Sequence, residues 1–152
     1  DLPPRVRERL AAPDLAARAQ RLESLAQQHG LSLLTPSDDA YPQRLAAIDG
    51  RPLVLFCRGR VEALADEAAI AVVGSRTPTP YGHDAAVELA RTLARAGTVL
   101  WSGLARGIDA IAHDQALAAG RPTVAVLAGR LDTVYAQEHS ALAERIVAGG
   151  GC

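Results

Sequence analysis

The sequence of 152 residues contains no lysine, so arginine carries all of its positive side-chain charge apart from histidine. The phosphate loop of the Walker type requires a lysine, and the absence of lysine therefore excludes that motif. Arginine presents a planar fork of donors that suits phosphate oxygens, and it also stacks on bases. A GC-rich genome favours arginine codons too, and we expect codon bias to explain most of the preference.

The chain also lacks a dominant sign of charge, because its formal net charge is −1 at pH 7. Overall attraction to a nucleic acid is therefore absent, and only a local cluster of arginines would bind one. Aromatic residues make up only 3% of the sequence. Alanine, leucine and valine must then fill the core, which favours close packing of helices on a sheet.

Metal ligands and membrane segments are missing as well. The two cysteines, Cys57 and Cys152, lie far apart without metal-ligand spacing, and the four histidines are scattered. We therefore predict no metal, no cofactor and a reduced, cytosolic setting. No hydrophobic run is long enough to span a membrane and no signal-peptide pattern opens the chain, so we expect no membrane association.

Hydrophobic residues make up 49% and charged residues 22%, which is typical of a globular domain. The length of 152 residues fits one domain, or one domain with a small appendage. The appendage begins with a helical pattern that starts at Pro13 and Asp14 and ends at Gly30. A turn signal follows at residues 36–39. We therefore expect residues 1–34 to be the end of a helical domain and residues 35–152 to form the main domain.

The main domain repeats one pattern three times. Continuous apolar runs of strand length are followed by glycine-containing turns and then by helical patterns. The runs span residues 69–73, 98–101 and 123–127, and the helical patterns span residues 81–96, 109–119 and 137–148. This order predicts an α/β fold with a parallel sheet and helices on both faces. Such sheets bind ligands at the carboxyl ends of their strands.

Three loops therefore deserve comparison, at residues 74–77, 102–109 and 128–132. Each combines glycine with a hydroxyl group or an arginine. Glycine allows close approach of the backbone to a ligand, and free N–H groups at helix N-termini favour an anion. The sequence thus predicts a groove for a phosphodiester chain. Its candidate residues are Gly74, Ser75, Arg76, Thr77, Ser102, Gly103, Arg106, Gly107 and Arg130.

Each feature also has a simpler explanation. A single glycine commonly closes a tight turn, and only the recurrence with arginine indicates an anion site. Asp109 and His113 have a spacing that suits acid/base chemistry, but a helix cap and a hydrogen bond that fastens the loop are the favoured interpretations. Tyr81 and Tyr135 either stack on a base or pack against the protein. Trp101 ends a strand, so we expect it in the core.

The same stretches resemble the DprA/Smf family of bacterial DNA-processing proteins. The resemblance rests on residues 69–76 (AIAVVGSR) and residues 102–109 (SGLARGID), and it runs from about Tyr41 to Gly151. It implies a Rossmann-like domain preceded by a sterile-alpha-motif-like helical domain. It further implies a recombination mediator that binds and protects incoming single-stranded DNA, forms a homodimer and loads RecA during natural transformation, without being an enzyme.

Within that resemblance, Arg76 is the strongest candidate for contacting DNA, and Arg106 and its neighbouring glycines shape the same pocket. The sequence departs from the family where Arg130, Ala136 and His139 replace glycine, proline and asparagine. The family's later segment is absent, and residues 149–152 come where another strand is expected to begin. We therefore expect a piece of a longer chain with a truncated Rossmann-like domain.

Two alternatives remain. The first is a nucleotide phosphoribohydrolase of the lysine-decarboxylase-like family, whose Pro-Gly-Gly-x-Gly-Thr stretch is missing here. The second is a regulatory module that binds a small nucleotide. Catalysis has little support, because neither a complete G-x-G-x-x-G fingerprint after the first strand nor a Gly-x-Ser-x-Gly turn is present.

Overall fold

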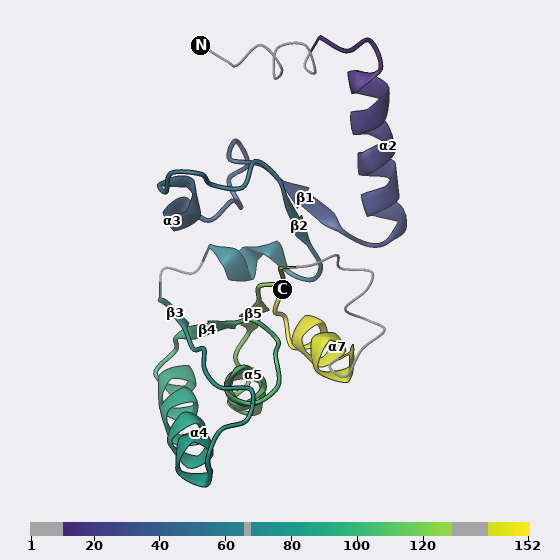
Figure 1. The fold of residues 1–152 in the computed structure, drawn as a ribbon. Helices are drawn as coiled ribbons and strands as arrows, with labels where there is room; N and C mark the ends of the chain where they lie inside the picture. Colours follow the sequence, from purple (N-terminus) through teal and green to yellow (C-terminus); the bar gives the residue numbers. More distant parts are fainter. Residues whose placement is uncertain (1–10, 66–67, 129–139) are drawn as a thin grey trace.

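The computed structural model describes residues 11–65, 68–128 and 140–152. Its first half contains one long helix, α2 (Leu15–Gln28), and a two-stranded antiparallel sheet of β1 (Ser32–Leu34) and β2 (Leu55–Cys57). A short helix α3 (Gln43–Ala46) lies between the two strands in sequence, and the 3-10 helix η1 (Val61–Leu64) follows β2. Figure 1 shows α2 standing apart from the rest of the chain.

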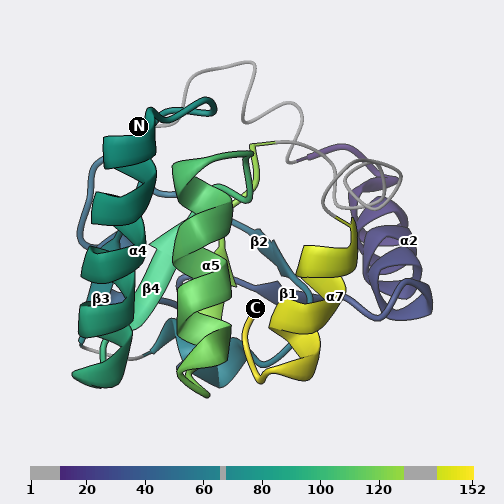
Figure 2. The same cartoon turned by 90° about the horizontal axis from the view of Figure 1, so that it is seen from below.

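The second half is the predicted parallel α/β unit, so the predicted fold class is confirmed. Strands β3 (Ala69–Ala71), β4 (Val99–Ser102) and β5 (Thr123–Ala125) pair in that order, all parallel. The helices are α4 (Pro80–Arg95), α5 (Ile108–Ala118) and α7 (Ser140–Ala148). Seen from below, α4, α5 and α7 lie side by side over one face of the molecule (Figure 2).

Helix α4 illustrates how local sequence sets the boundaries of an element. The Thr79 hydroxyl accepts a hydrogen bond from the Gly82 N–H, and Pro80 occupies the first helical position. Ala86, Ala90 and Ala94 recur every four residues and are buried, which gives a smooth face for packing against α5. Gly97 follows the helix with φ +92°, a conformation that favours glycine.

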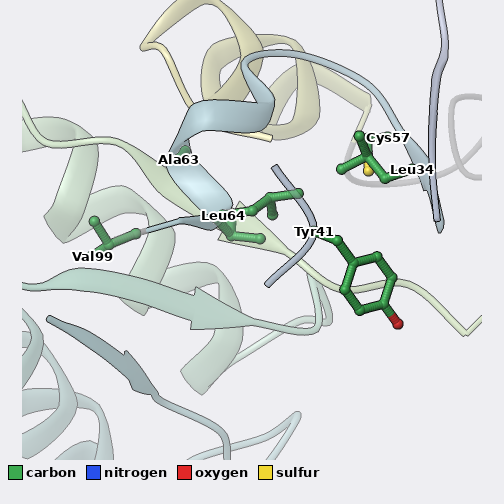
Figure 3. Packing of buried hydrophobic residues seen from close by; sticks show 7 residues of the cluster. Leu34, Tyr41, Cys57, Ala63, Leu64 and Val99 are labelled. Atoms are coloured by element: carbon green, nitrogen blue, oxygen red, sulfur yellow. The ribbon is translucent and has the colours of Figure 1, made fainter. Parts of the chain in front are cut away.

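The central strand β4 divides the core into two parts, because its side chains alternate between the two faces of the sheet. Leu100 packs with α4 and α5, whereas Val99 and Trp101 pack on the opposite face with Leu64 and Tyr41. Figure 3 shows part of this second cluster, gathered between the two sheets. Among the described residues, helices therefore lie on both faces, as predicted, but unequally: α4, α5 and α7 lie on one face, and the short 3-10 helix η1 lies on the other.

The prediction that every strand is buried on both faces is wrong for β3. Ile70 is 43% exposed, and Val73, just after the strand, is 71% exposed. Among the described residues β3 pairs only with β4, so it is an edge strand with less to pack against. Strand β4, between two neighbours, is buried along its length apart from the partly exposed Trp101.

Cys152 continues the sheet beyond β5. Its N–H donates to the Thr123 carbonyl at 3.2 Å, and its own carbonyl accepts from the Ala125 N–H at 2.8 Å. This is the pattern of a parallel pair opposite Val124. The sequence predicts another strand at this point, and the structure shows these two hydrogen bonds without a further assigned strand.

The predicted helix at the start of the chain is confirmed as α2, but its apolar stripe is largely exposed. Leu15, Leu22 and Leu25 are 38%, 44% and 43% exposed, and only Ala26 is buried. Strand β1 lies before the predicted domain boundary between residues 34 and 35, whereas its partner β2 lies after that boundary. The two sides are therefore joined by hydrogen bonds, and the boundary itself stays a prediction. Within the described ranges, no helix has both the length and the hydropathy needed to cross a membrane.

A buried histidine makes stability depend on pH. Thr123 Oγ1 donates to the Leu100 carbonyl at 2.6 Å, so His113 Nδ1 must donate to Thr123 Oγ1, 2.8 Å away. His113 Nε2 is then left without a partner in a fully buried position. Burial lowers the pKa of His113 to about 4, although the nearby Asp109 and Asp114 raise this pKa in part.

We therefore predict that acid weakens the fold through His113. The folded pKa lies below the unfolded value of 6.5, so the unfolded chain binds the extra proton first and stability falls as the pH drops from 6.5 to about 4. The loss should reach about 3 kcal/mol. Urea unfolding at several pH values measures it, and His113→Gln should reduce the slope in this window. An unchanged slope in the variant would contradict the assignment.

Candidate nucleic-acid interface

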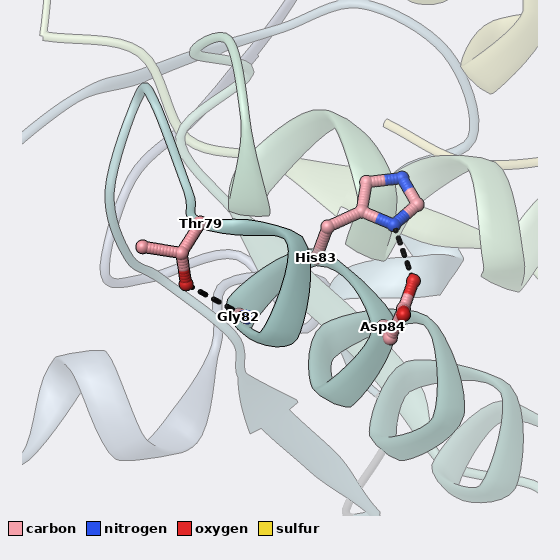
Figure 4. A network of polar contacts seen from close by, with 4 residues as sticks. All are labelled: Thr79, Gly82, His83 and Asp84. Atoms are coloured by element: carbon pink, nitrogen blue, oxygen red, sulfur yellow. Dashed lines mark hydrogen bonds and ion pairs between the residues drawn. The ribbon is translucent and has the colours of Figure 1, made fainter.

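The first loop, residues 74–77, leaves the carboxyl end of β3 and leads toward α4. All four of its residues are exposed. The Thr77 N–H donates to the Ser75 hydroxyl oxygen at 3.1 Å, which leaves the Ser75 hydroxyl proton available as a donor. Beyond the loop, α4 begins with the Thr79 cap and a polar contact between His83 Nδ1 and Asp84 Oδ1 at 3.1 Å (Figure 4).

The second loop, residues 103–107, leaves the carboxyl end of β4 and leads into α5. The buried Asp109 carboxylate accepts a hydrogen bond from the Gly103 N–H at 3.1 Å, so the first turn of α5 holds the beginning of its own loop. Leu104 has a φ of +59° and is buried against Leu142 and Ile146. This anchoring leaves Arg106 exposed at the outer part of the loop.

The two loops are in direct backbone contact. The Ile108 N–H donates to the Ser75 carbonyl at 3.1 Å. Gly107 has a φ of +80°, and a Cβ added there would lie 2.2 Å from the Ser75 carbonyl oxygen. A Cβ at Gly74 would lie 2.7 Å from Ile108 Cγ1. Only glycine fits at either position, so these residues allow two loops from different strands to form one surface.

This contact places the two arginines on one rim of the sheet. Arg76 follows Ser75, Arg106 precedes Gly107, and both side chains are exposed. Among the described residues, no carboxylate lies within ion-pair distance of Arg76. An exposed guanidinium at a glycine-lined edge can donate two parallel hydrogen bonds to a phosphate. The arrangement is therefore chemically suited to an anionic chain.

Several N–H groups expected to face an anion are already used inside the protein. The Ile108 N–H bonds to Ser75, the Gly103 N–H bonds to Asp109, and the Ala110 N–H bonds to the Ala105 carbonyl. The expectation of free N–H groups at the start of α5 is therefore corrected for Ile108 and Ala110, and the Gly103 N–H in the preceding loop is engaged as well. Their hydrogen bonds fasten the loop instead of receiving a ligand.

Ser102 also has a different role from the one expected of its hydroxyl. The residue is buried, and its Oγ donates to the Val72 carbonyl at 2.6 Å, across from β4 to the segment after β3. The hydroxyl thus ties together the carboxyl ends of neighbouring strands. In this arrangement its proton does not point to solvent, so the Ser102 hydroxyl is not available as a donor to a phosphate.

The expected hydrogen bond between Asp109 and His113 is replaced by two separate ones. Asp109 bonds to Gly103, and His113 bonds to Thr123 on β5. Sequence reasoning missed Thr123, although a hydroxyl residue at the start of a buried apolar run was the available signal. Both members of the pair therefore hold the scaffold that carries the loops.

Other candidates fall into three groups. Trp101 packs in the core as predicted. Tyr81 lies in the first turn of α4 with 83% of its surface exposed, so its ring is available for contact with a base. Gly129, Arg130, Leu131, Asp132 and Tyr135, from the third loop, lie outside the described residues. No cluster of three metal-ligating side chains occurs in the part of the chain that the structure describes.

Together, the fold and the loops define a Rossmann-like α/β module with two interlocked glycine- and arginine-bearing loops at the carboxyl edge of its sheet. The chain belongs to the DprA/Smf family: the family model described as DNA recombination-mediator protein A matches residues 32–152. The match begins at the first residue of β1, two residues before the end of the predicted helical appendage.

Curated relatives agree with this membership. The chain is 41% identical over 153 residues to a putative DNA processing protein DprA of Mycobacterium tuberculosis, covering 92% of this chain and 39% of that protein. It is 33% identical over 126 residues to DNA processing protein DprA of Bacillus subtilis, covering 83% of this chain and 42% of that protein. The chain thus spans about two fifths of the length of these relatives.

Two solved structures share the fold. DprA of Streptococcus pneumoniae superposes with a TM-score of 0.70 at 33% identity, over 80% of this chain and 41% of that one. DprA of Helicobacter pylori superposes with a TM-score of 0.65 at 31% identity, over 79% and 53% of the two chains. The latter structure is described as giving insight into a unique mode of binding single-stranded DNA.

The close contact between the two loops predicts that adding a methyl group at Gly107 lowers the stability of the protein. Gly107→Ala places a Cβ against the Ser75 carbonyl and forces a positive φ on alanine, so we expect a loss of about 3 kcal/mol of unfolding free energy. Gly120→Ala is the matched control, because Gly120 has a φ of +68° with nothing within 4 Å of an added Cβ. It should cost about 1 kcal/mol. Equal losses in urea unfolding would contradict the close approach.

Proposed function

We propose that this chain binds single-stranded DNA in the cytoplasm along the surface formed by residues 74–77 and 103–107. The proposal includes the wider role of the family: protecting incoming DNA and loading RecA during natural transformation. The observation that carries it is the backbone contact of Ser75 with Gly107 and Ile108, which brings Arg76 and Arg106 to one exposed rim. The single-stranded DNA binding described for the Helicobacter pylori relative supports the choice of ligand.

The side chains on the rim suit a nucleic acid that is recognised through its phosphate backbone. Arg76, the Ser75 hydroxyl and the Thr77 hydroxyl are donors within one exposed turn. Donors of this kind contact phosphates and carry little sequence information. Tyr81, exposed at the start of α4, adds an aromatic face on which a base can stack. We propose Gly74, Gly103 and Gly107 as shape-giving residues, Arg76 and Arg106 as phosphate contacts, and Arg130 as a further contact.

We propose binding without catalysis. Asp109 and His113, the pair that the sequence singles out for its acid/base spacing, are engaged in hydrogen bonds to Gly103 and Thr123. Both side chains are buried, so neither reaches a ligand on the rim. Release of a free base from a nucleoside monophosphate would instead favour the phosphoribohydrolase alternative, and stabilisation by a small nucleotide but not by an oligonucleotide would favour the regulatory module.

We propose RecA loading and homodimer formation for the whole protein, because this chain spans only about two fifths of the length of its relatives. RecA nucleation on a single strand coated with single-strand-binding protein is the direct assay. The protein should shorten the lag before RecA hydrolyses ATP. Sedimentation at several concentrations tests the dimer, which a constant monomer mass would exclude.

The first prediction from this proposal concerns Arg76. Arg76→Ala removes a charge-assisted contact to phosphate, so affinity for labelled oligo-dT should fall about 10- to 100-fold. The slope of log K against log salt concentration should become shallower by about 0.7. Fluorescence anisotropy between low and moderate salt measures both quantities.

The matched control for Arg76 is Arg95→Ala. Arg95 is also exposed, but it ends α4, a helix of 16 residues that begins just after the first loop. It therefore lies about 24 Å from the start of that helix. The control should bind like the parent. If Arg76→Ala also binds like the parent, the rim is not the DNA site.

A second prediction compares the affinities for single-stranded and double-stranded DNA. The full-length protein should bind a labelled single strand more tightly than a duplex of equal length, because only unpaired bases are available for stacking on Tyr81. Tyr81→Leu should reduce this preference, whereas it should leave the salt dependence unchanged. Equal affinity of the parent for both forms would contradict single-strand selectivity.

A further inference from the structure

Two segments far apart in sequence lie side by side at the junction of the two sheets. The Arg60 N–H donates to the Gly151 carbonyl at 2.9 Å, and a Cβ added to Gly59 would lie 3.2 Å from the Cα of Cys152. Figure 1 places the end of the chain between the two-stranded sheet and the parallel sheet. The residues that follow β2 and the position beside β5 are thus in direct contact.

The only two cysteines of the sequence meet at this junction. Cys57 ends β2 and is buried in the cluster that contains Leu34, Tyr41 and Val124. Cys152 packs against the same cluster and is half-buried. Both thiols are free in the structure. Among the described residues no metal cluster uses them, and the proposed DNA surface does not include them.

The environments of the two sulfur atoms differ. The Cys57 thiol donates a hydrogen bond to Cys152, and the Arg58 backbone N–H donates to Cys152 as well. These two donors stabilise a Cys152 thiolate, so the pKa of Cys152 is lowered although its partial burial opposes this. The pKa of Cys57 is raised because its thiol is the donor in this pair and because it is buried. Cys152 is also the less buried of the two residues, so it is the thiol that a small disulfide reaches first.

We propose that Cys57 and Cys152 form a redox-sensitive pair, which a low-molecular-weight disulfide converts into an intrachain disulfide that joins β2 to the parallel sheet. The inference does not depend on the proposed DNA binding, because it rests on a different face of the sheet. Its substrate class is a small disulfide such as oxidised glutathione.

The exchange proceeds in two balanced steps. The Cys152 thiolate attacks one sulfur of oxidised glutathione, the bond between the two glutathione sulfurs breaks, and one glutathione thiolate leaves and takes up a proton. Cys57 then loses its proton to the solvent, and its sulfur attacks the Cys152 sulfur of the mixed disulfide. The second glutathione thiolate leaves and is protonated. The two protein thiols are oxidised, and one glutathione disulfide is reduced to two thiols.

The bridge would restrain the segment that covers one face of the sheet. Helix η1 lies between Cys57 and β3 in the chain, and its Leu64 packs in the same cluster as Cys57. Linking residue 57 to residue 152 closes a long loop, which removes conformations from the unfolded chain. The oxidised protein should therefore melt about 5–10 °C above the reduced protein.

The test exposes the purified protein to excess oxidised glutathione and then maps its peptides by mass spectrometry without reduction. The expected product is one peptide pair joined through Cys57 and Cys152, lighter by two hydrogen atoms and carrying no glutathione, with the rise in melting temperature. Glutathione retained on both cysteines, a disulfide between two chains, or unreacted thiols would each overturn the proposal.

Single variants separate the two roles. Cys57→Ser should trap glutathione on Cys152, because the second attack cannot occur. Cys152→Ser should leave Cys57 unreacted while the protein is folded, because Cys57 is buried without a nucleophilic neighbour. Circular dichroism checks that each variant is folded, and the peptide map of the parent remains decisive if one is not. Trapping on Cys57 in the Cys152→Ser variant would overturn the assignment of the nucleophile.

Discussion

The contact between the Ser75 carbonyl and the start of α5 is the constraint on which the candidate site depends. A parallel sheet brings the loops after β3 and β4 to the same edge, but it does not bring their backbones together. The hydrogen bond from Ile108 and the missing Cβ of Gly107 do so. Because of this contact, Arg76 and Arg106 share one surface instead of lying on two independent loops.

The polar residues beneath that surface stabilise the scaffold. Asp109 holds Gly103, Ser102 holds the segment after β3, and His113 is bonded to Thr123 on the neighbouring strand. All are buried, where an unmade hydrogen bond is costly, so the loops inherit a defined geometry from the sheet. The exposed residues of the loops include the charged Arg76 and Arg106, whereas the buried polar residues fix the conformation of the loops.

The two faces of the sheet have different partners. Alanines of α4 and α5 pack closely on one face, whereas η1 and residues near the two-stranded sheet cover the other. The second face depends on contacts between distant segments, among them Arg60 with Gly151 and Cys57 with Cys152. These contacts join the residues that end and follow β2 to residues 151 and 152.

The sequence by itself determined the elements, their parallel order and the edge at which the loops gather. The signals used were local: the spacing of hydrophobic residues, the turn residues, and the repeated order of strand, turn and helix. Helices α4 and α5 and strand β4 could therefore be predicted from nearby residues. The recurrence of glycine and arginine in the loops indicated the candidates Arg76 and Arg106, and the resemblance to a family made Arg76 the strongest of them. Tertiary structure alone decided which polar groups face the solvent. Ser102 and Gly103 are used internally, His113 bonds to Thr123, and β3 is an exposed edge, because hydrogen-bond partners and burial come from segments distant in the chain.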